Sequence, residues 1–225
     1  MTGMLASVSS VEEAKLVLSE NVDIIDLKNP ALGSLGGLDI ERVRKIVNII
    51  NGKRPISATV GDLPMQPELI FKAVTEMAET GVNFIKIGFF ASENQYQVIA
   101  KLALLTSKIN LIAVLFADIN PEFTIINKLI AAGFKGIMLD TQDKTNGSLT
   151  EVMAKTEIAR FVNQVKSTGT ICGLAGSLRL EDIPMLLAYQ PDYLGFRGAL
   201  CDKHKRAGQL NVQSVQAIKQ AIDVS

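Results

Sequence analysis

The chain has 225 residues, of which 48% are hydrophobic and 20% are charged. This size suits one domain with a sizeable core, which we place over residues 1–225. Lysine plus arginine and aspartate plus glutamate both number 23, so no net charge attracts nucleic acid or an anionic membrane, and neither is expected as a partner. No apolar run is long enough to span a bilayer and no signal-peptide pattern opens the chain, which predicts a cytoplasmic protein.

Short β-rich runs alternate with longer amphipathic stretches along the whole chain, which is typical of a parallel sheet. About eight strands are predicted, the number that a closed (β/α)8 TIM barrel needs. A doubly wound open sheet is the competing architecture, and periodicity alone does not exclude it. The strand count and a phosphate-type ending favour the barrel. The predicted strands are Met4–Val8, Ile24–Lys28, Ile56–Gly61, Phe84–Phe89, Leu111–Asp118, Gly136–Thr141, Thr170–Ser177 and Tyr193–Ala199.

The predicted helices begin and end with ordinary signals. Ser10 and Glu13 form a candidate capping box before the first helix. Gly81 follows the helical pattern that starts near Ile70, at the place where a left-handed C-terminal residue is wanted. These signals place the strands and helices in one consistent order.

Alternation along the second and fourth strands sends two lysines into one interior. Asp26 and Lys28 share the face opposite Ile25 and Leu27, and Lys86 occupies the inner face of the fourth strand. The two lysines are therefore expected near each other, inside the barrel.

Other strands add polar groups to the same interior. Asp140 points inward on the sixth strand, Ser57 and Thr59 form a polar inner stripe on the third, and Arg197 lies inward or at the rim on the last. A buried salt-bridge network without function would account for the charged residues equally simply. Against it, desolvating several charges is costly, and ionisable groups at strand ends are more often functional.

Two lysines in one partly buried cavity disfavour each other's charged form, so one is expected as a free amine at neutral pH. Such an amine can attack a ketone or aldehyde and form a Schiff base. Asp26 and Asp140 could hold the lysines and move protons during dehydration and enolisation. Residue chemistry alone leaves open which lysine forms the imine.

The last two strands end in Gly176-Ser177 and Arg197-Gly198, where many barrels bind phosphate through backbone N–H groups. These four residues, together with Ser57 and Thr59 on the third strand, are the predicted substrate- and phosphate-binding site. The following run, Lys203–Arg206, is either a further source of cations or a solvated charged face. His204 is assigned to that exposed loop.

Two cysteines, Cys172 and Cys201, are too few for a disulfide framework and fit a reducing compartment. Only His204 could join them at a zinc ion, so no metal site is expected. The run Gly33–Gly37 matches neither a P-loop nor a dinucleotide fingerprint, so no cofactor is expected. Its glycines permit a loop that folds closely over a ligand.

The combined motifs resemble the (5-formylfuran-3-yl)methyl phosphate synthase family, over essentially the whole chain and in order. The resemblance rests on Asp26-Leu27-Lys28-Asn29-Pro30, Gly33-Ser34-Leu35-Gly36, Ser57-Ala58-Thr59-Val60-Gly61-Asp62, Ile85-Lys86-Ile87-Gly88, Met138-Leu139-Asp140-Thr141, Leu174-Ala175-Gly176-Ser177, and Phe196-Arg197-Gly198-Ala199 with Cys201.

This resemblance implies a barrel lyase that converts two glyceraldehyde 3-phosphate molecules into a furan aldehyde phosphate, a precursor of methanofuran-type coenzymes. It implies that Lys28 is the Schiff-base lysine and Lys86 a second catalytic lysine. Asp26, Asp140 and Lys144 match further charged positions of the family's active site. Two triose phosphates as substrates imply two anion subsites.

The chain departs from the family pattern between the fifth and sixth strands, where Ala117-Asp118-Ile119-Asn120-Pro121 leads into a short connection. This departure suggests a bacterial, methylotroph-type branch. Another class I aldolase or an isomerase on the same barrel is the alternative enzyme, and a non-catalytic sugar-phosphate-binding protein is the alternative from another class. The sequence leaves the oligomeric state open between a monomer and a homo-oligomer.

Overall fold

Eight parallel strands pair in chain order and close into a barrel in the computed structural model, which describes residues 1–224. Ser225, the last residue of the expected domain, lies outside the described residues. Closure comes from β1 and β8, which pair in parallel from Gly3 with Tyr193 to Ala6 with Phe196. The strands are β1 (Gly3–Val8), β2 (Ile24–Leu27), β3 (Ile56–Thr59), β4 (Phe84–Phe89), β5 (Leu111–Phe116), β6 (Gly136–Asp140), β7 (Ile171–Leu174) and β8 (Tyr193–Phe196).

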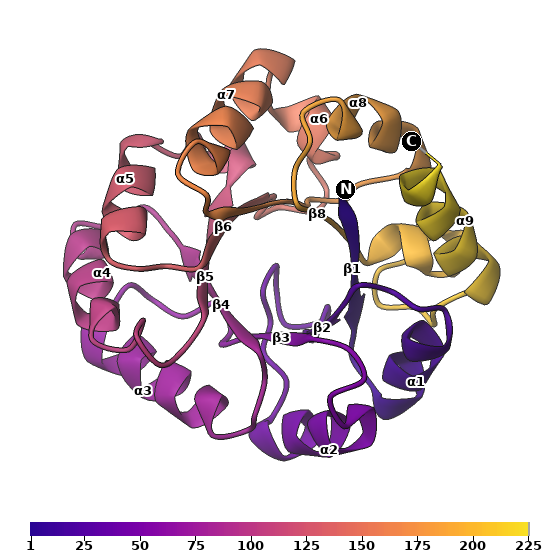
Figure 1. The fold of residues 1–225 in the computed structure, drawn as a ribbon, viewed down its shortest axis with the longest axis horizontal. Coiled ribbons are helices and arrows are strands. Elements are labelled where there is room, and N and C mark those ends of the chain that lie inside the picture. The colour runs from indigo at the N-terminus through magenta and orange to yellow at the C-terminus, as the bar shows by residue number, and fades with distance from the viewer. Residues whose placement is uncertain (225) are drawn as a thin grey trace.

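The helices form a ring outside the strands (Figure 1). They are α1 (Val11–Ser19), α2 (Ile40–Ile50), α3 (Pro67–Ala78), α4 (Gln95–Ala103), α5 (Thr124–Ala131), α6 (Leu149–Val152), α7 (Lys155–Lys166), α8 (Ile183–Leu187) and α9 (Val212–Asp223). Short 3-10 helices follow several strands: η1 (Ala117–Ile119), η2 (Leu180–Asp182), η3 (Gly198–Leu200) and η4 (Asp202–His204). Among the helices of residues 1–224, none has the length and apolarity needed to cross a bilayer. The predicted TIM barrel is thus confirmed, and the open sheet is excluded by closure.

Most strands end earlier than predicted, because the polar and glycine residues at their carboxyl ends leave the ladder and form loops. Thr141 and Ser177 are two such residues, beyond the ends of β6 and β7, whereas Lys28 keeps one ladder bond past the end of β2. The shift matters for function, since the loops after the strands are where TIM barrels build their sites.

Two layers of apolar side chains follow from the alternation along the strands. The larger layer packs between strands and helices and includes Ile25, Ile85 and Ile137. The smaller layer fills the barrel interior and is formed by Leu5, Ile24, Leu35, Ile112, Val114, Phe116, Met138 and Ala175. This inner layer reaches the carboxyl ends of the strands, where Phe116 ends β5 and Ala175 follows β7, so it borders the polar cluster inside the barrel.

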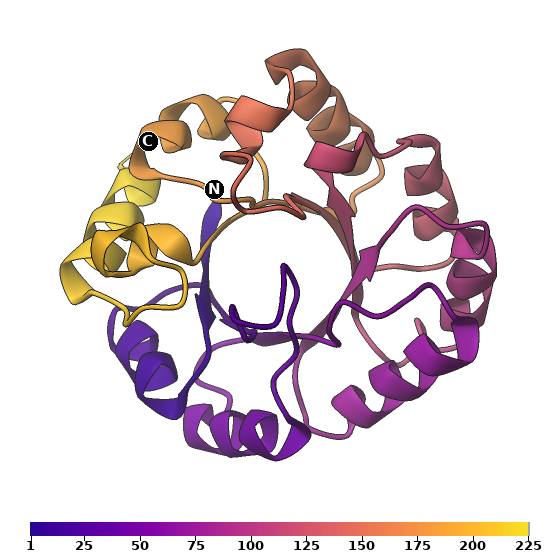
Figure 2. The ribbon, with the colours of Figure 1, turned by 180° about the vertical axis from the view of Figure 1, so that it is seen from behind.

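One loop enters the barrel mouth. The segment between β2 and α2 projects over the centre of the ring in both views (Figures 1 and 2), and its Leu35 is buried in the inner apolar layer. Asp62, after β3, fixes this loop by accepting hydrogen bonds from the Leu35 amide at 3.0 Å and the Ser34 hydroxyl at 3.2 Å. The predicted glycine-rich loop thus covers part of the barrel mouth.

Candidate active site

A cavity of about 300 Å³ lies at the carboxyl ends of the strands. Its lining brings together every charged residue that the sequence assigned to catalysis: Asp26, Lys28, Lys86, Asp140 and Lys144. The walls also include Ser7 on β1, the residues after β7 and the residues after β8. Concave sites of this size at this end of a TIM barrel suit a small ligand.

Lys28 follows β2 directly, and its backbone amide donates to Val8 O at 3.0 Å, which extends the parallel ladder by one residue. The side chain is only 6% exposed and lines the cavity. Within residues 1–224, its Nζ has no hydrogen-bond or ion-pair partner. Lys28 is therefore a buried amine that faces the cavity and is free to react.

The surroundings favour the neutral form of this amine. Burial lowers the pKa of Lys28 to about 8, helped by the positive charges of Lys86 and Lys144 and opposed by Asp140 and Asp26. A lysine with this pKa has a substantial unprotonated fraction near neutral pH, unlike an exposed lysine with a pKa of about 10.4.

Asp26 and Lys86 form a fully buried ion pair beneath Lys28. The Lys86 Nζ lies 2.5 Å from Asp26 Oδ1, and hydroxyls of Ser57 and Ser7 donate to the same carboxylate at 2.6 and 2.8 Å. Burial raises the pKa of Asp26, but the nearby charges of Lys86 and Lys28 and the hydrogen bonds outweigh it, so that the net pKa lies below the usual value. The carboxylate is thus held ionised.

Asp140 and Lys144 form a second pair. Asp140 ends β6, and the Lys144 ammonium bonds to its carboxylate and to the backbone and hydroxyl oxygens of Thr141. Burial raises the pKa of Asp140, yet the charges of Lys144 and Lys28 reverse the effect and leave the pKa lowered. Asp118 places this loop by accepting from the amides of Gln142 and Asp143.

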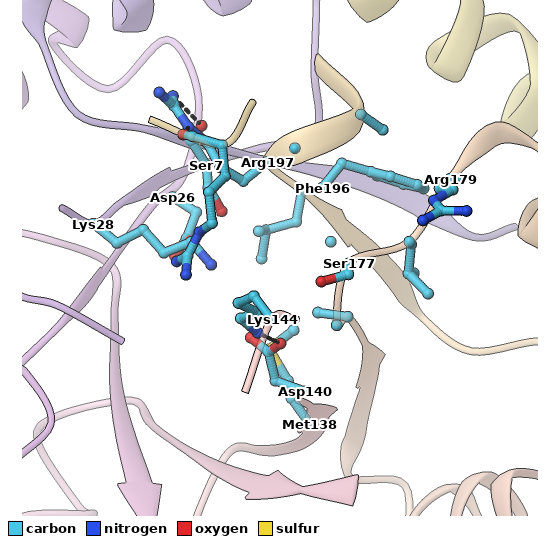
Figure 3. A pocket seen from close by; sticks show the side chains of 18 of the residues that line it. Ser7, Asp26, Lys28, Met138, Asp140, Lys144, Ser177, Arg179, Phe196 and Arg197 are labelled. Carbon is cyan, nitrogen blue, oxygen red and sulfur yellow. Dashed lines mark hydrogen bonds and ion pairs between the residues drawn. The ribbon is translucent and has the colours of Figure 1, made fainter. Parts of the chain in front are cut away.

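The two pairs lie on different sides of the cavity (Figure 3). Lys28 enters from the side that carries Asp26, and Asp140 with Lys144 lies across from it. Ser177 and Arg179 form another edge. A small carbonyl compound in this space would meet one free amine and two carboxylate–ammonium pairs.

The residues predicted to bind phosphate after β7 and β8 present backbone N–H groups at the cavity. Gly176 has φ +110° and Ser177 has φ +49°, and a Cβ on Gly176 would lie 2.9 Å from the Thr141 amide nitrogen. In the described chain, the N–H groups of Gly176, Ser177, Gly198 and Ala199 have no intramolecular acceptor. These residues line the cavity, and such groups bind phosphate oxygens well.

Arg197 does not fit the role of a direct phosphate ligand that the sequence suggested. Its Nη1 and Nη2 bond to the Glu13 carboxylate at 2.7 and 3.0 Å. Its remaining N–H groups donate to the carbonyls of Arg206, Ser7 and Gly208 at 2.7, 3.2 and 3.0 Å. All five guanidinium donors are occupied by the protein, so Arg197 positions the loop after β8.

Ser57 and Thr59 also have other roles than phosphate binding. The Ser57 hydroxyl donates to Asp26, and the Thr59 hydroxyl donates to Gly36 O at 3.2 Å. Neither residue lines the main cavity. Ser57 therefore orients the Asp26 carboxylate, and Thr59 holds the loop that carries Leu35.

Sequence reasoning missed three residues at this end of the barrel. Glu13 was read only as a capping residue: Ser10 does cap α1, but the Glu13 carboxylate accepts from Ser9 and Arg197 instead of completing the box. Leu35 and Asp62 had signals only in the family motifs. Lys203, His204 and Lys205 are exposed, as expected of a surface loop, but His204 also lines the cavity together with Arg206, so the charged run divides between both interpretations.

Comparison with solved structures supports the architecture. TrpF from Jonesia denitrificans superposes with a TM-score of 0.71 at 12% identity, covering 99% of this chain and 97% of its own. A 3-hexulose-6-phosphate synthase superposes with a TM-score of 0.68 at 15% identity, and the match covers 98% of this chain and 100% of that protein. At such identities the likeness shows the fold alone.

Sequence comparison is more specific. A protein of Methylorubrum extorquens, provisionally named (5-formylfuran-3-yl)methyl phosphate synthase, is 39% identical over 96% of this chain and 91% of its own. The (5-formylfuran-3-yl)methyl phosphate synthase of Methanocaldococcus jannaschii is 33% identical over 96% of this chain and 98% of its own. The family model described as 4-HFC-P synthase matches residues 4–219. The chain therefore belongs to the 4-HFC-P synthase family.

Proposed function

We propose that this chain is a Schiff-base-forming carbon–oxygen lyase that condenses two molecules of glyceraldehyde 3-phosphate to (5-formylfuran-3-yl)methyl phosphate. Loss of one phosphate and two water molecules balances the atoms. The product would serve the biosynthesis of methanofuran-type cofactors. Family membership and the names of the relatives support the product.

One observation carries the mechanism: the buried Lys28 amine has a pKa of about 8, lacks a partner within residues 1–224 and faces a cavity with two carboxylate–ammonium pairs. An amine in this state is a competent nucleophile toward a carbonyl carbon. The other two cavity lysines are paired with carboxylates, which favours Lys28 over Lys86 as the imine-forming residue.

In the first steps, one of the two glyceraldehyde 3-phosphate molecules would react in the form of its ketone isomer. The Lys28 nitrogen attacks the carbonyl carbon, and the carbinolamine loses its hydroxyl group as water to give the protonated imine. The ring carbon of the product that carries the phosphomethyl group is the former ketone carbon, so the protonated imine acts as the electrophile. A proton leaves C2 of the second triose phosphate and phosphate leaves its C3, and the resulting enol attacks the imine carbon through C3 while the C=N electron pair moves to nitrogen. Later elimination of the Lys28 amine frees the lysine.

The two ion pairs would handle the protons. The Asp26–Lys86 and Asp140–Lys144 pairs each combine a carboxylate that can accept a proton with an ammonium that can donate one. Asp26 lies beside Lys28, and Asp140 with Lys144 lies across the cavity. Ring closure and dehydration complete the furan. Aromatisation makes the sequence effectively irreversible.

The test is incubation of the purified protein with glyceraldehyde 3-phosphate alone. Formation of a furan chromophore with release of one phosphate per furan supports the proposal. A class I aldolase or isomerase would instead release no phosphate and yield no furan. Lys28→Ala should abolish turnover, and Lys53→Ala, at an exposed lysine, is the matched control.

Borohydride reduction followed by peptide mass spectrometry tests the covalent step. We expect the substrate-derived mass on the peptide that contains Lys28, and no adduct in Lys28→Ala. Lys86→Ala should slow turnover while leaving the adduct trappable. Binding of triose phosphate without any reducible adduct would favour a non-catalytic sugar-phosphate-binding protein.

A further inference from the structure

Two phosphate groups enter the proposed reaction, whereas the unpaired N–H groups that residues 1–224 present after β7 and β8 form one cluster. A second phosphate monoester in the same cavity needs its own donors, because two dianions repel each other and cannot share one set. The cavity lining supplies several cationic side chains. A phosphate ligand among these cations must have donors that the protein does not already use.

Most of these cations are already engaged. Lys86 is paired with Asp26, and Lys144 directs its ammonium to Asp140 and Thr141. Every donor of Arg197 has a protein acceptor. Lys28 is the nucleophile and must stay free for the carbonyl carbon. Arg179 is half exposed, with Nη1 at 4.0 Å from Glu181.

Arg206 differs from the paired cations by its free donors and from Arg179 by its greater burial. It is partly buried in the loop after η4, and its Nη2 donates to Gly33 O at 3.0 Å. Within the described residues, Nε and Nη1 have no acceptor and the guanidinium has no carboxylate partner within ion-pair distance. A partly buried guanidinium with most of its donors free is costly unless an anion completes it.

The position of Arg206 also fits. It lines the main cavity and an adjoining groove that contains Gly33, Lys144 and Thr145. This places it between the loop that follows Lys28 and the loop that carries Lys144. Arg197 holds it there, because Arg197 Nε donates to the Arg206 carbonyl at 2.7 Å.

We propose that Arg206 is the principal ligand of the second phosphate monoester, which it binds along the guanidinium edge that the Nη2 bond to Gly33 leaves free. The inference rests on the proposed function and adds a specificity-determining residue to it. A planar guanidinium fork matches two phosphate oxygens, and exclusion of water strengthens that contact. Because the same group bonds to Gly33, phosphate binding links the loop after β2 to the loop after β8.

The electrostatic surroundings agree with this assignment. Burial lowers the pKa of Arg206, and Arg197 adds to that effect while Asp140 and Asp62 oppose it. The arginine stays cationic at neutral pH in any case. The positive charge of Arg206 is thus only partly compensated by the protein, and a bound phosphate dianion would neutralise the remainder.

The experiment compares Arg206→Gln and Arg206→Lys with Lys205→Gln, a variant at the neighbouring exposed cation that does not line the cavity. We expect Arg206→Gln to raise KM for glyceraldehyde 3-phosphate about 10- to 100-fold, because the variant loses hydrogen bonds to a charged phosphate group. Arg206→Lys should recover part of this. Lys205→Gln should stay within about twofold of the unmodified protein.

Adduct trapping with unphosphorylated dihydroxyacetone separates phosphate binding from a structural role. Arg206→Gln should trap it as efficiently as the unmodified protein, since no phosphate is involved. Equal losses with phosphorylated and unphosphorylated substrates would overturn the inference, and so would a KM equal to that of Lys205→Gln.

Calorimetric titration with inorganic phosphate keeps this test independent of turnover. The unmodified protein should bind two equivalents and Arg206→Gln one. If the unmodified protein makes no furan, the proposed reaction fails on its own, while the phosphate stoichiometry still decides the role of Arg206. Identical stoichiometry in both proteins would rule out the second site at this residue.

Discussion

Lys86 Nζ lies 2.5 Å from Asp26 Oδ1, and the two side chains are 4% and 0% exposed. The pair connects β4 to β2 inside the barrel, directly below the strand end that carries Lys28. Ion pairs buried this deeply gain little net stability, because desolvation offsets their attraction. Asp26 instead fixes the position of Lys86 at the cavity and leaves Lys28 unpaired.

Asp26→Asn should lower the free energy of unfolding by about 3 kcal/mol at pH 7, because it leaves the Lys86 ammonium buried without a counter-charge. The pKa of Asp26 is lowered in the fold, so its contribution is present above the unfolded pKa of about 3.9 and lost as pH falls through the folded value. Urea unfolding from pH 7 to pH 3 should show the difference shrinking. Asp26→Asn combined with Lys86→Met should recover most of the loss; a double variant no more stable than the single one would contradict this explanation.

The rate of imine formation should follow the unprotonated fraction of Lys28. With a pKa of about 8, the rate rises with pH up to about that value and then levels off. Asp140→Asn removes a charge that raises this pKa, so the midpoint should move down. Lys144→Met removes a charge that lowers it, so the midpoint should move up.

Adduct trapping between pH 6 and 10 measures these midpoints without requiring turnover. The two variants act as controls for each other, since they disrupt the same ion pair and differ only in the sign of the expected shift. Shifts in the same direction would show that the variants act through altered structure instead of charge.

Lys28→Met should stabilise the fold while abolishing chemistry. Burial lowers the pKa of Lys28 from about 10.4 unfolded to about 8 folded, which corresponds to about 3 kcal/mol of destabilisation at or below pH 8. Between these two pKa values the unfolded chain binds more protons, so the penalty declines as pH rises. Urea unfolding should show a gain of about 1 to 3 kcal/mol at pH 7 that is smaller at pH 10, with Lys53→Met unchanged as the exposed control.

The barrel and its inner charges were predictable because both follow from local periodicity. A strand exposes alternate residues to opposite faces, so the positions of Ile25 and Leu27 determine where Asp26 points. The same rule placed Lys86 and Asp140 inward. These side chains lie on regular strands, and the structure confirms their common location.

The loops were less predictable, because their side chains meet partners that are remote in sequence. Arg197 follows a strand and was expected to face a phosphate, yet its carboxylate partner Glu13 lies 184 residues away. Thr59 alternates correctly but donates to Gly36 in a loop that crosses the barrel mouth. No pattern within one strand encodes such contacts.

Glu13→Gln should loosen the loop after β8. It removes the charge that pairs with Arg197, whose other bonds hold the carbonyls of Arg206 and Gly208. We expect a stability loss of about 3 kcal/mol and faster tryptic cleavage after Lys203, Lys205 and Arg206. Glu12→Gln, at the exposed neighbour on the same turn, should cleave at the original rate.

Gly176→Ala should damage the backbone anion site. The residue has φ +110°, which disfavours an L side chain, and its new Cβ would lie 2.9 Å from the Thr141 amide nitrogen. The backbone must shift, which moves the N–H groups of Gly176 and Ser177 away from the phosphate. We expect a loss of about 1 to 3 kcal/mol in stability and a higher KM for glyceraldehyde 3-phosphate.

Gly169→Ala is the control that separates damage to the backbone anion site from the general strain of placing alanine at a positive φ. Gly169 has φ +73° with nothing within 4 Å of an added Cβ, and it lies before β7, away from the cavity. It should lose about 1 kcal/mol of stability and keep the original KM, because only the left-handed backbone is penalised. Steady-state kinetics beside urea unfolding measure both quantities for each variant. If KM rose equally in the two, the effect of Gly176→Ala would come from general destabilisation, and the phosphate would have to be held elsewhere.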